Sequence, residues 1–427
     1  MAAAGITGFQ ETTTYKVVLP FYAYGALSFF LSALLLFLNT ELFEHHHFHP
    51  ITLTITHLMA LGWGTMVILG ASHQLLPVLI SGKLQSVALG HLAFVFTAIG
   101  IPFLATGFYQ FKFDWVLKTG AILINTGVIC YLVNVVISIH KSKKQEVHAW
   151  FILAAGLWLF STTFFGLLLV YNYHGNLIFT KNSVAYLSLH AHMGIIGWFL
   201  TLVFGVGSRL IPLFLISKYN SPKTLWLILI LVNSGLISFI TLKLMGLSEV
   251  FYSLPILLIL SAVVAFLVYC RKAYLSRIRK NVDMQVKLSM IAVLQMLVPV
   301  LVLIVVIALL PTGDKQQLAL LYGFCIFFGW LTAIILGMTF KTMPFIVWNK
   351  VYQKGKRTAS GAPPAPKELF NHKIYEVTTY TYLIGFVLFI PAILLLHSVL
   401  LKIAATVMLL SALFYVINVS ITLFHKA

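Results

Sequence analysis

Long, unbroken runs of apolar residues separated by short polar segments dominate the chain. Each run is close to the ~20 residues that a helix needs to cross a bilayer. Twelve such runs can be marked, at residues 17–38, 51–80, 86–108, 115–139, 148–171, 185–217, 222–245, 251–270, 285–310, 316–348, 376–396 and 400–423. Their continuity excludes the alternating pattern of a membrane β-barrel. The pattern therefore predicts an all-α integral membrane protein with twelve transmembrane helices.

The polar segments between the runs carry most of the charge and predict an orientation. With an even number of spans both termini lie on one side, and that side carries twenty Lys and Arg against six on the other. Cytoplasmic loops are enriched in Lys and Arg. We therefore expect both termini in the cytoplasm and the chain in a cytoplasmic (inner) membrane. The longest polar segment, 349–375, is predicted to be a flexible, basic cytoplasmic loop and not a second domain.

Composition supports this class and excludes others. Only 9% of the residues are charged and 60% are hydrophobic, whereas a soluble domain carries about a quarter charged residues. The formal charge of +18 reflects orientation in the membrane and not a nucleic-acid partner, so membrane lipids are the expected surroundings. The three Cys lie in apolar runs without a CxxC pair, which argues against disulfides and zinc–thiolate sites. Fifteen His, more than the ten acidic residues, are the unusual feature.

A repeated frame links three of the spans. It consists of a Gly-Trp pair, a Gly eight residues after the first Gly, and a Pro fifteen residues after it. Its copies are Gly62-Trp63, Gly70 and Pro77; Gly197-Trp198, Gly205 and Pro212; and Gly329-Trp330, Gly337 and Pro344. We interpret the chain as one membrane domain, 1–427, of three pseudo-threefold four-helix repeats at about 17–139, 148–270 and 285–423. The glycines would allow a neighbouring helix or a flat ligand to approach.

Histidines occupy equivalent positions on this frame. Five residues before the Gly-Trp pairs stand His57, His192 and Phe324, and two residues earlier stand Ile55, His190 and Tyr322. Ionisable groups inside a membrane are functional candidates, and imidazole is a common ligand of haem iron. Equal register predicts that His57 and His192 bind one haem from opposite faces. His190 would point from the other side of its helix into a neighbouring crevice. The alternative is that these His bond to the backbone or line a water-filled path.

Two further groups of His each admit two interpretations. The run His45, His46, His47 and His49 precedes the second span and could form a copper or zinc site, or a solvated loop that caps the helix before Pro50. His73 and His91 could meet across a helical hairpin, as a second haem site or proton path, or as two packing residues. Arg209 and Lys341 hold matching positions near the ends of their spans, where contact with lipid phosphate or snorkelling is expected.

These residues resemble a known family. Twelve spans with cytoplasmic termini and a threefold repeat resemble the catalytic subunit of haem–copper oxidases and nitric oxide reductases. The segment His190-Ala191-His192, with the Gly-Trp pair that follows it, is similar to the tenth helix of that family. The resemblance implies one or two haem b groups, with His57 and His192 on a low-spin haem and His190 on a high-spin haem. It also implies an oxidoreductase with a cytochrome c or quinol donor and other respiratory subunits as partners.

The sequence departs from that family in ways that change the expected chemistry. The HxH pair lies on the sixth span, the tenth span has no His, and the seventh lacks an adjacent His pair. No Asp or Glu lies in the middle of a span. We therefore expect no copper centre of the usual kind and no proton pumping. The His-rich, twelve-span NnrS-like proteins of the nitric oxide response are a second family to which the chain is similar.

Two other classes of function stay open on the sequence. Repeats and Gly/Pro-interrupted helices are also typical of transporters, here of haem, copper or another small solute. The chain could equally be a non-catalytic subunit or assembly factor of a respiratory complex. The His57 and His192 register favours haem binding over both.

Overall fold

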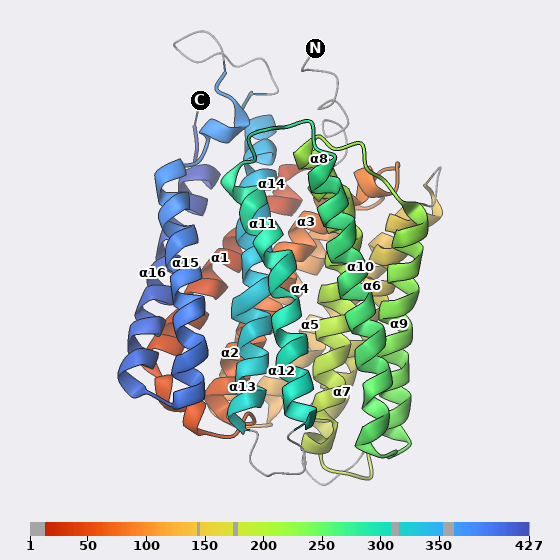
Figure 1. The fold of residues 1–427 in the computed structure, drawn as a ribbon, viewed down its shortest axis with the longest axis vertical. Helices are drawn as coiled ribbons and strands as arrows, with labels where there is room; N and C mark the ends of the chain where they lie inside the picture. Colours follow the sequence, from red (N-terminus) through yellow and green to blue (C-terminus); the bar gives the residue numbers. More distant parts are fainter. Residues whose placement is uncertain (1–12, 143–145, 174–177, 309–315, 353–362, 427) are drawn as a thin grey trace.

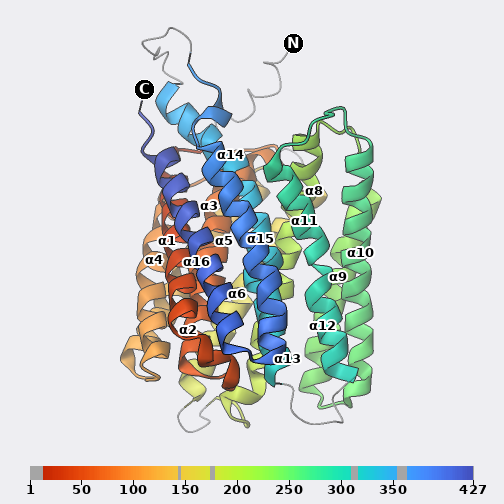
Figure 2. The ribbon, with the colours of Figure 1, turned by 60° about the vertical axis from the view of Figure 1, so that its left-hand side comes forward.

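The computed structural model describes residues 13–142, 146–173, 178–308, 316–352 and 363–426. Within these ranges twelve helices are long and apolar enough to cross a membrane, which confirms the predicted fold class. The helices lie side by side along one axis, and the first begins at the end of the bundle where the last finishes (Figures 1 and 2). We call this end the terminal side and the other end the far side.

Nine of the twelve spans lie around the other three. They are α1 (Tyr15–Leu38), α4 (Val87–Tyr109), α5 (Trp115–His140), α6 (Val147–Asn172), α9 (Pro222–Leu244), α10 (Ser253–Leu275), α11 (Met284–Gln295) with α12 (Leu297–Ala308), α15 (His372–Leu395) and α16 (Ser398–Leu423). In the described ranges four short helices lie between the spans or at their ends, namely η2 (Thr40–Glu44), η4 (Ser183–Tyr186), η6 (Glu249–Tyr252) and η9 (Pro366–Glu368). Helices adjacent in the sequence pack in pairs, as α4 does on α5, α9 on α10 and α15 on α16.

The other three spans form the interior, and they are the spans that carry the repeated frame. Span 2 consists of α2 (Pro50–His57), η3 (Leu58–Thr65) and α3 (Met66–Leu79). Span 6 consists of α7 (Leu187–His192), η5 (Met193–Leu200) and α8 (Thr201–Leu215), and span 10 of α13 (Gln316–Phe324), η8 (Cys325–Leu331) and α14 (Thr332–Tyr352). Their most apolar stretches are 56%, 78% and 78% buried, more than those of any other span described. All three line one central cavity of about 650 Å³. This agrees with the predicted inner triangle, while exact threefold symmetry stays a prediction.

Each inner span changes from α- to π-helix at its Gly-Trp pair. A π turn holds an extra residue and shifts the backbone hydrogen bonds. Two threonine hydroxyls donate to carbonyls five residues back, Thr201 to Ile196 at 2.9 Å and Thr332 to Phe327 at 2.6 Å. In span 10 Gly329 leaves the helical conformation altogether, with φ −91° and ψ −119°. The glycine therefore marks a break in that span.

The second Gly of each frame lies where two helices approach closely. It does not line a ligand site. A Cβ at Gly70, Gly205 or Gly337 would lie less than 3.0 Å from an atom of Phe21, Phe151 or Ser289, respectively. These three residues belong to α1, α6 and α11, the first helix of each predicted repeat. Of the two interpretations of the glycines, the structure favours helix packing.

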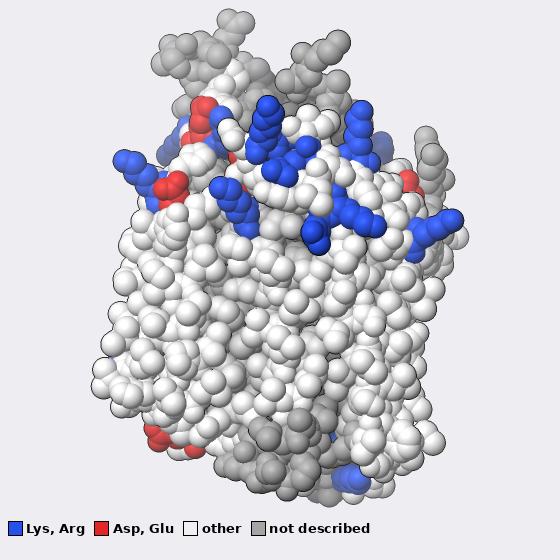
Figure 3. All heavy atoms as spheres, viewed as in Figure 1, with Lys and Arg blue, Asp and Glu red and all other residues white. Residues whose placement is uncertain are grey.

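Charged side chains gather at the ends of the bundle, and most Lys and Arg visible in Figure 3 lie on the terminal side. The positive-inside rule then favours a cytoplasmic terminal side, although the orientation stays a prediction. Residues 353–362 of the predicted basic loop lie outside the described residues.

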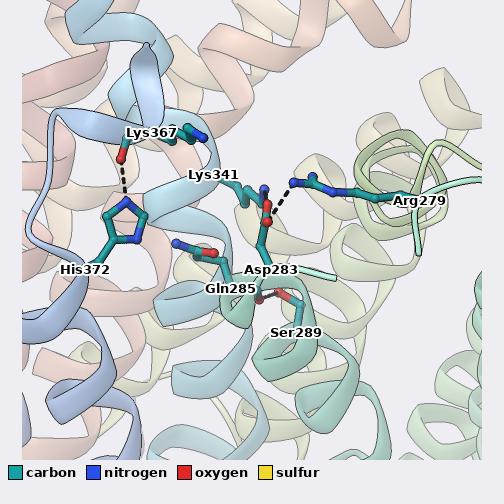
Figure 4. Close-up of polar contacts among 7 residues, drawn as sticks. All are labelled: Arg279, Asp283, Gln285, Ser289, Lys341, Lys367 and His372. Carbon is teal, nitrogen blue, oxygen red and sulfur yellow. Dashed lines mark hydrogen bonds and ion pairs between the residues drawn. The ribbon is translucent and has the colours of Figure 1, made fainter. Parts of the chain in front are cut away.

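Lys341, expected to meet lipid phosphate or to snorkel, instead forms an ion pair within the protein. Its partner is Asp283, the residue before α11, and the same carboxylate accepts a hydrogen bond from Arg279 at 2.7 Å (Figure 4). The pair joins the terminal-side ends of α11 and span 10. Arg209, at the matching position of span 6, is exposed.

Candidate functional site

Two of the predicted ligands, His57 and His190, lie together in a cavity between spans 2 and 6. This first cavity holds about 1160 Å³ of empty space, and its wall is mainly apolar and aromatic. The two imidazole rings are nearly parallel, with 6.3 Å between their centroids and 23° between their planes. Helices α4, α5 and α6 close the remaining sides of the cavity.

Local contacts leave Nε2 of His57 and one nitrogen of His190 without a partner among the described residues. His57 Nδ1 lies 2.8 Å from the carbonyl oxygen of Leu53, so Nδ1 carries the proton and Nε2 keeps a free lone pair. Phe108 packs on the ring at 4.4 Å between centroids. Nδ1 of His190 is buried and has no hydrogen-bond partner among the described residues. Gly166 lies against this ring, since a Cβ there would lie 2.8 Å from His190 Cε1.

His192 lies in a second cavity, between spans 6 and 10, which holds about 1220 Å³. Its Nδ1 is 2.7 Å from the Ser188 carbonyl oxygen, so Nε2 is the acceptor, and the Tyr322 hydroxyl lies 3.2 Å from it. Phe239 packs on the His192 ring at 4.9 Å between centroids. Lys243 also lines this cavity.

The predicted pairing of His57 with His192 is therefore corrected: His57 faces His190, and His192 faces Tyr322. The physical reason is that residues two apart on a helix point about 200° apart. An inner helix between two neighbours presents one of these positions to each of them. The residue five positions before one Gly-Trp pair thus faces the residue seven positions before the Gly-Trp pair of the next inner span. It does not face the residue five positions before that next pair.

Two of the three frame tryptophans donate a hydrogen bond to a threonine of another inner span. Trp198 donates its indole N–H to Thr65 and Trp63 donates to Thr332, both at 3.0 Å. Each acceptor lies three residues after the Gly of its own frame. At that position span 6 has Leu200, which cannot accept a hydrogen bond. For the buried Trp330 indole the described part of the chain provides no acceptor, and this ring lines the second cavity.

The histidine run before span 2 forms two pairs and not one cluster. The ring centroids of His45 and His49 are 4.6 Å apart, and those of His46 and His47 are 3.9 Å apart. Partial burial lowers the pKa of His47 and of His49, and the neighbouring His46 and His45 lower them further. No group of three or more His, Cys, Asp or Glu within the described ranges could hold one metal ion. A copper site here stays a prediction.

His73 is a packed residue in span 2. Its Nδ1 lies 2.7 Å from the Leu69 carbonyl oxygen, and its ring packs against Phe21 and Tyr131 at 5.6 and 5.5 Å between centroids. Its Nε2 is buried and forms no hydrogen bond to any described residue, His91 included. Of the two sequence interpretations, these contacts favour packing.

Sequence reasoning did not single out Tyr322, although the signal was present. Tyr322 occupies the same frame position as His190, so a comparison of that position across the three spans would have found it. Lys243 and Phe239 come from α9, outside the frame, and no sequence pattern connects them to the second cavity.

Comparison with known proteins adds no family to this picture. No protein-family model and no curated protein matches the chain. What the resemblance to haem–copper oxidases implies therefore stays an expectation. The function proposed below is based on the geometry of the two cavities.

Proposed function

We propose that the chain is a haem-binding membrane protein that holds one b-type haem in the first cavity, with His57 and His190 as axial ligands. One observation carries the proposal. Two histidines from neighbouring inner spans lie with nearly parallel rings 6.3 Å apart in a large, mainly apolar cavity.

The residues of the cavity fit such a group. Imidazole nitrogens bind metals at about 2 Å, and His57 has its Nε2 free because Leu53 fixes the proton on Nδ1. A ligating His commonly donates its other ring N–H to a backbone carbonyl in this way. The ring of His190 has a buried nitrogen without a partner, as expected where a bound group completes a site. Phe108, Phe113 and Tyr173 in the wall suit a flat aromatic ligand.

This site supports a role in electron transfer or in the chemistry of nitric oxide or oxygen. A haem supplies one-electron transfer when both axial positions are taken, and gas binding when one is open. The chain itself would hold the group, fix the imidazole orientation through Leu53 and exclude water with the apolar wall. We propose an oxidoreductase component of a respiratory membrane, with a cytochrome c or quinol donor. It would lack the usual copper centre and proton pumping, because the tenth span has no His and no span has a central carboxylate.

The test is the haem content and visible spectrum of the protein purified in detergent from haem-replete cells. We expect one haem b per chain by pyridine haemochrome, with a six-coordinate low-spin spectrum. His57→Ala and His190→Ala should each lose that spectrum. His192→Ala is the matched control and should keep it, because its ring lines the other cavity. The absence of a Soret band in fresh preparations would remove the proposal, and loss of the spectrum in His192→Ala but not in His190→Ala would restore the original pairing.

A transporter is the second candidate, favoured by the break at Gly329 in an inner span beside a central cavity. Haem would then be cargo and not a resident group. Vesicles that contain the protein should in that case take up haem, and bound haem should exchange with added haem. A resident haem stays in place through dialysis against apo-myoglobin or a similar acceptor.

A further inference from the structure

We infer that the second cavity binds a single-chain amphiphile with an anionic head group, of the long-chain carboxylate class. The cavity holds about 1220 Å³, and its wall comes from spans 6 and 10 and from α9, α10 and α12. Because α10 packs against both α9 and α12, helices surround the space in the plane of the membrane. The cavity has one charged end and one apolar end, and this difference identifies the class of ligand.

The charged end lies on the far side, where Lys243 lines the cavity. Lys243 is the last residue but one of α9, and its ammonium lies 6.0 Å from the centre of the Tyr252 ring, which lines the same end. No ion pair joins Lys243 to any carboxylate side chain that the structure describes. A cation beside apolar walls at the end of a membrane span gains from an anionic partner. The head group of an amphiphile supplies that partner at this depth.

The opposite end lies towards the middle of the bundle and is apolar. Leu200, Val263 and Met296 line it. Leu200 takes the frame position at which the two other inner spans carry a threonine. A polar ligand would lose its hydrogen bonds to water against such a wall without replacing them. An acyl chain has no hydrogen bonds to lose, so the apolar end favours a hydrocarbon tail.

The depth of the cavity suits one acyl chain. Pro255, Ile259 and Val263 line it from α10, which is a regular α-helix over this stretch. The rise from Pro255 to Val263 is about 12 Å, at about 1.5 Å per residue. Each leaflet of a bilayer provides about 15 Å of hydrocarbon depth. A tail of ordinary length therefore fits along α10 with its head group at Lys243.

The other polar contact in the wall leaves the head group to Lys243. The Ser188 carbonyl fixes the proton of His192 on Nδ1, and the Tyr322 hydroxyl donates to Nε2. Both protons are thus in use within the protein, and neither is available to a carboxylate. One cation matches one monovalent head group. A phospholipid adds a second chain, and the helices around the cavity would separate that chain from the first. The occupant is therefore a free long-chain carboxylate.

The test uses the full-length protein in nanodiscs of zwitterionic phosphatidylcholine. The probe is stearate with a nitroxide on its chain, and electron paramagnetic resonance separates immobilised from mobile probe. Unlabelled palmitate should displace one immobilised probe per chain. Hexadecanol, which has the same chain length and no charge, should compete about tenfold more weakly, as the loss of a hydrogen bond to a charged group implies.

Variants of the cavity identify the site. Lys243→Gln should lower the affinity for palmitate about tenfold and remove the preference over hexadecanol, and Lys243→Arg should restore both. Lys243→Glu should instead prefer hexadecylamine, which carries the opposite charge. Lys118→Gln is the matched control and should bind palmitate as the wild type does. Its ammonium also lies over a tyrosine ring, 5.0 Å from the centre of Tyr171, but it does not line this cavity. Val300→Trp, which fills the cavity from α12, should abolish displaceable binding in protein that elutes normally in gel filtration.

Three results would overturn the inference. Equal competition by palmitate and hexadecanol, unchanged in Lys243→Gln, would indicate an uncharged acyl-chain crevice. Displacement by phosphatidylglycerol as effective as that by palmitate would indicate a phospholipid site. Displaceable binding that survives in Val300→Trp would place the ligand elsewhere. His57→Ala should bind palmitate as the wild type does, because its residue belongs to the first cavity, so the haem proposal and this inference can fail independently.

Discussion

The two large cavities of this protein have the same framework and different chemistry. Each lies between two inner spans, and in each a histidine five residues before a Gly-Trp pair faces the residue seven before the next such pair. In the first cavity that residue is His190, and in the second it is Tyr322. Two imidazoles can ligate one metal, whereas an imidazole and a phenol form a hydrogen-bonded pair. One frame position thus separates a pair of imidazoles from an imidazole–phenol pair.

The cavities also differ in how their walls are joined. Spans 2 and 6 are linked by the hydrogen bond from Trp198 to Thr65, and spans 2 and 10 by that from Trp63 to Thr332. The corresponding link between spans 6 and 10 is missing, because Leu200 replaces the threonine. Among the described residues, the inner contact beside the second cavity is therefore the one without this link.

Replacement of His190 in the first cavity should have the largest effect on haem content. His190→Tyr makes its wall resemble that of the second cavity, and we expect haem content to fall from one per chain to near zero. Pyridine haemochrome on protein that elutes normally in gel filtration measures this. Retention of a low-spin spectrum would show that His190 is not a ligand.

The reverse exchange should give the second cavity a pair of histidines. In Tyr322→His we expect haem content to rise above one per chain, up to two, since His192 gains an imidazole opposite it. Tyr322→Phe is the control, and it should show no gain in haem, because it adds no imidazole. An unchanged haem content in Tyr322→His would mean that more than the frame position separates the two cavities.

The links between inner spans should have a smaller, measurable effect on stability. Thr65→Val removes the acceptor of Trp198 with little change of shape, and we expect a loss of about 1 kcal/mol in the free energy of unfolding, in the range for hydrogen bonds between membrane helices. Leu200→Thr should be more stable than the size-matched Leu200→Val, because Trp330 gains an acceptor. Reversible unfolding in mixed micelles measures both. Equal stabilities of the two Leu200 variants would indicate that Trp330 does not face this position.

The smallest effect concerns the histidine run beside the first cavity, which Phe48 helps to line. Burial and the neighbouring His46 lower the pKa of His47. His46→Gln removes the charge contribution, so the pKa of His47 should rise part of the way towards 6.5 and the ring should stay protonated to higher pH. Titration of labelled histidines by NMR follows this change. A pKa of His47 that does not move would leave burial as the only cause.

Much of the architecture could be predicted from the sequence, because spans are read from length and hydropathy alone. The frame also identified the three interior spans. The partner of His57 could not be predicted in the same way, since equal register fixes the depth of a side chain but not the neighbour it faces. That direction depends on the order of the helices around the centre, which no local pattern encodes. The ion pair between Lys341 and Asp283 escaped prediction for the same reason: its residues are 58 positions apart.

The π-helical segments have a consequence for how the chain tolerates lost residues. A π turn contains one residue more than the α turn that could replace it, so each inner span holds a spare residue at the level of its Gly-Trp pair. Deletion of Leu61 within η3 can convert that segment to α-helix and leave both flanks facing their neighbours. Deletion of Ile68 in α3 would rotate one flank by about 100° and misalign it with the rest of the bundle. The π-helical segment of each inner span is therefore also the place where the span can lose one residue.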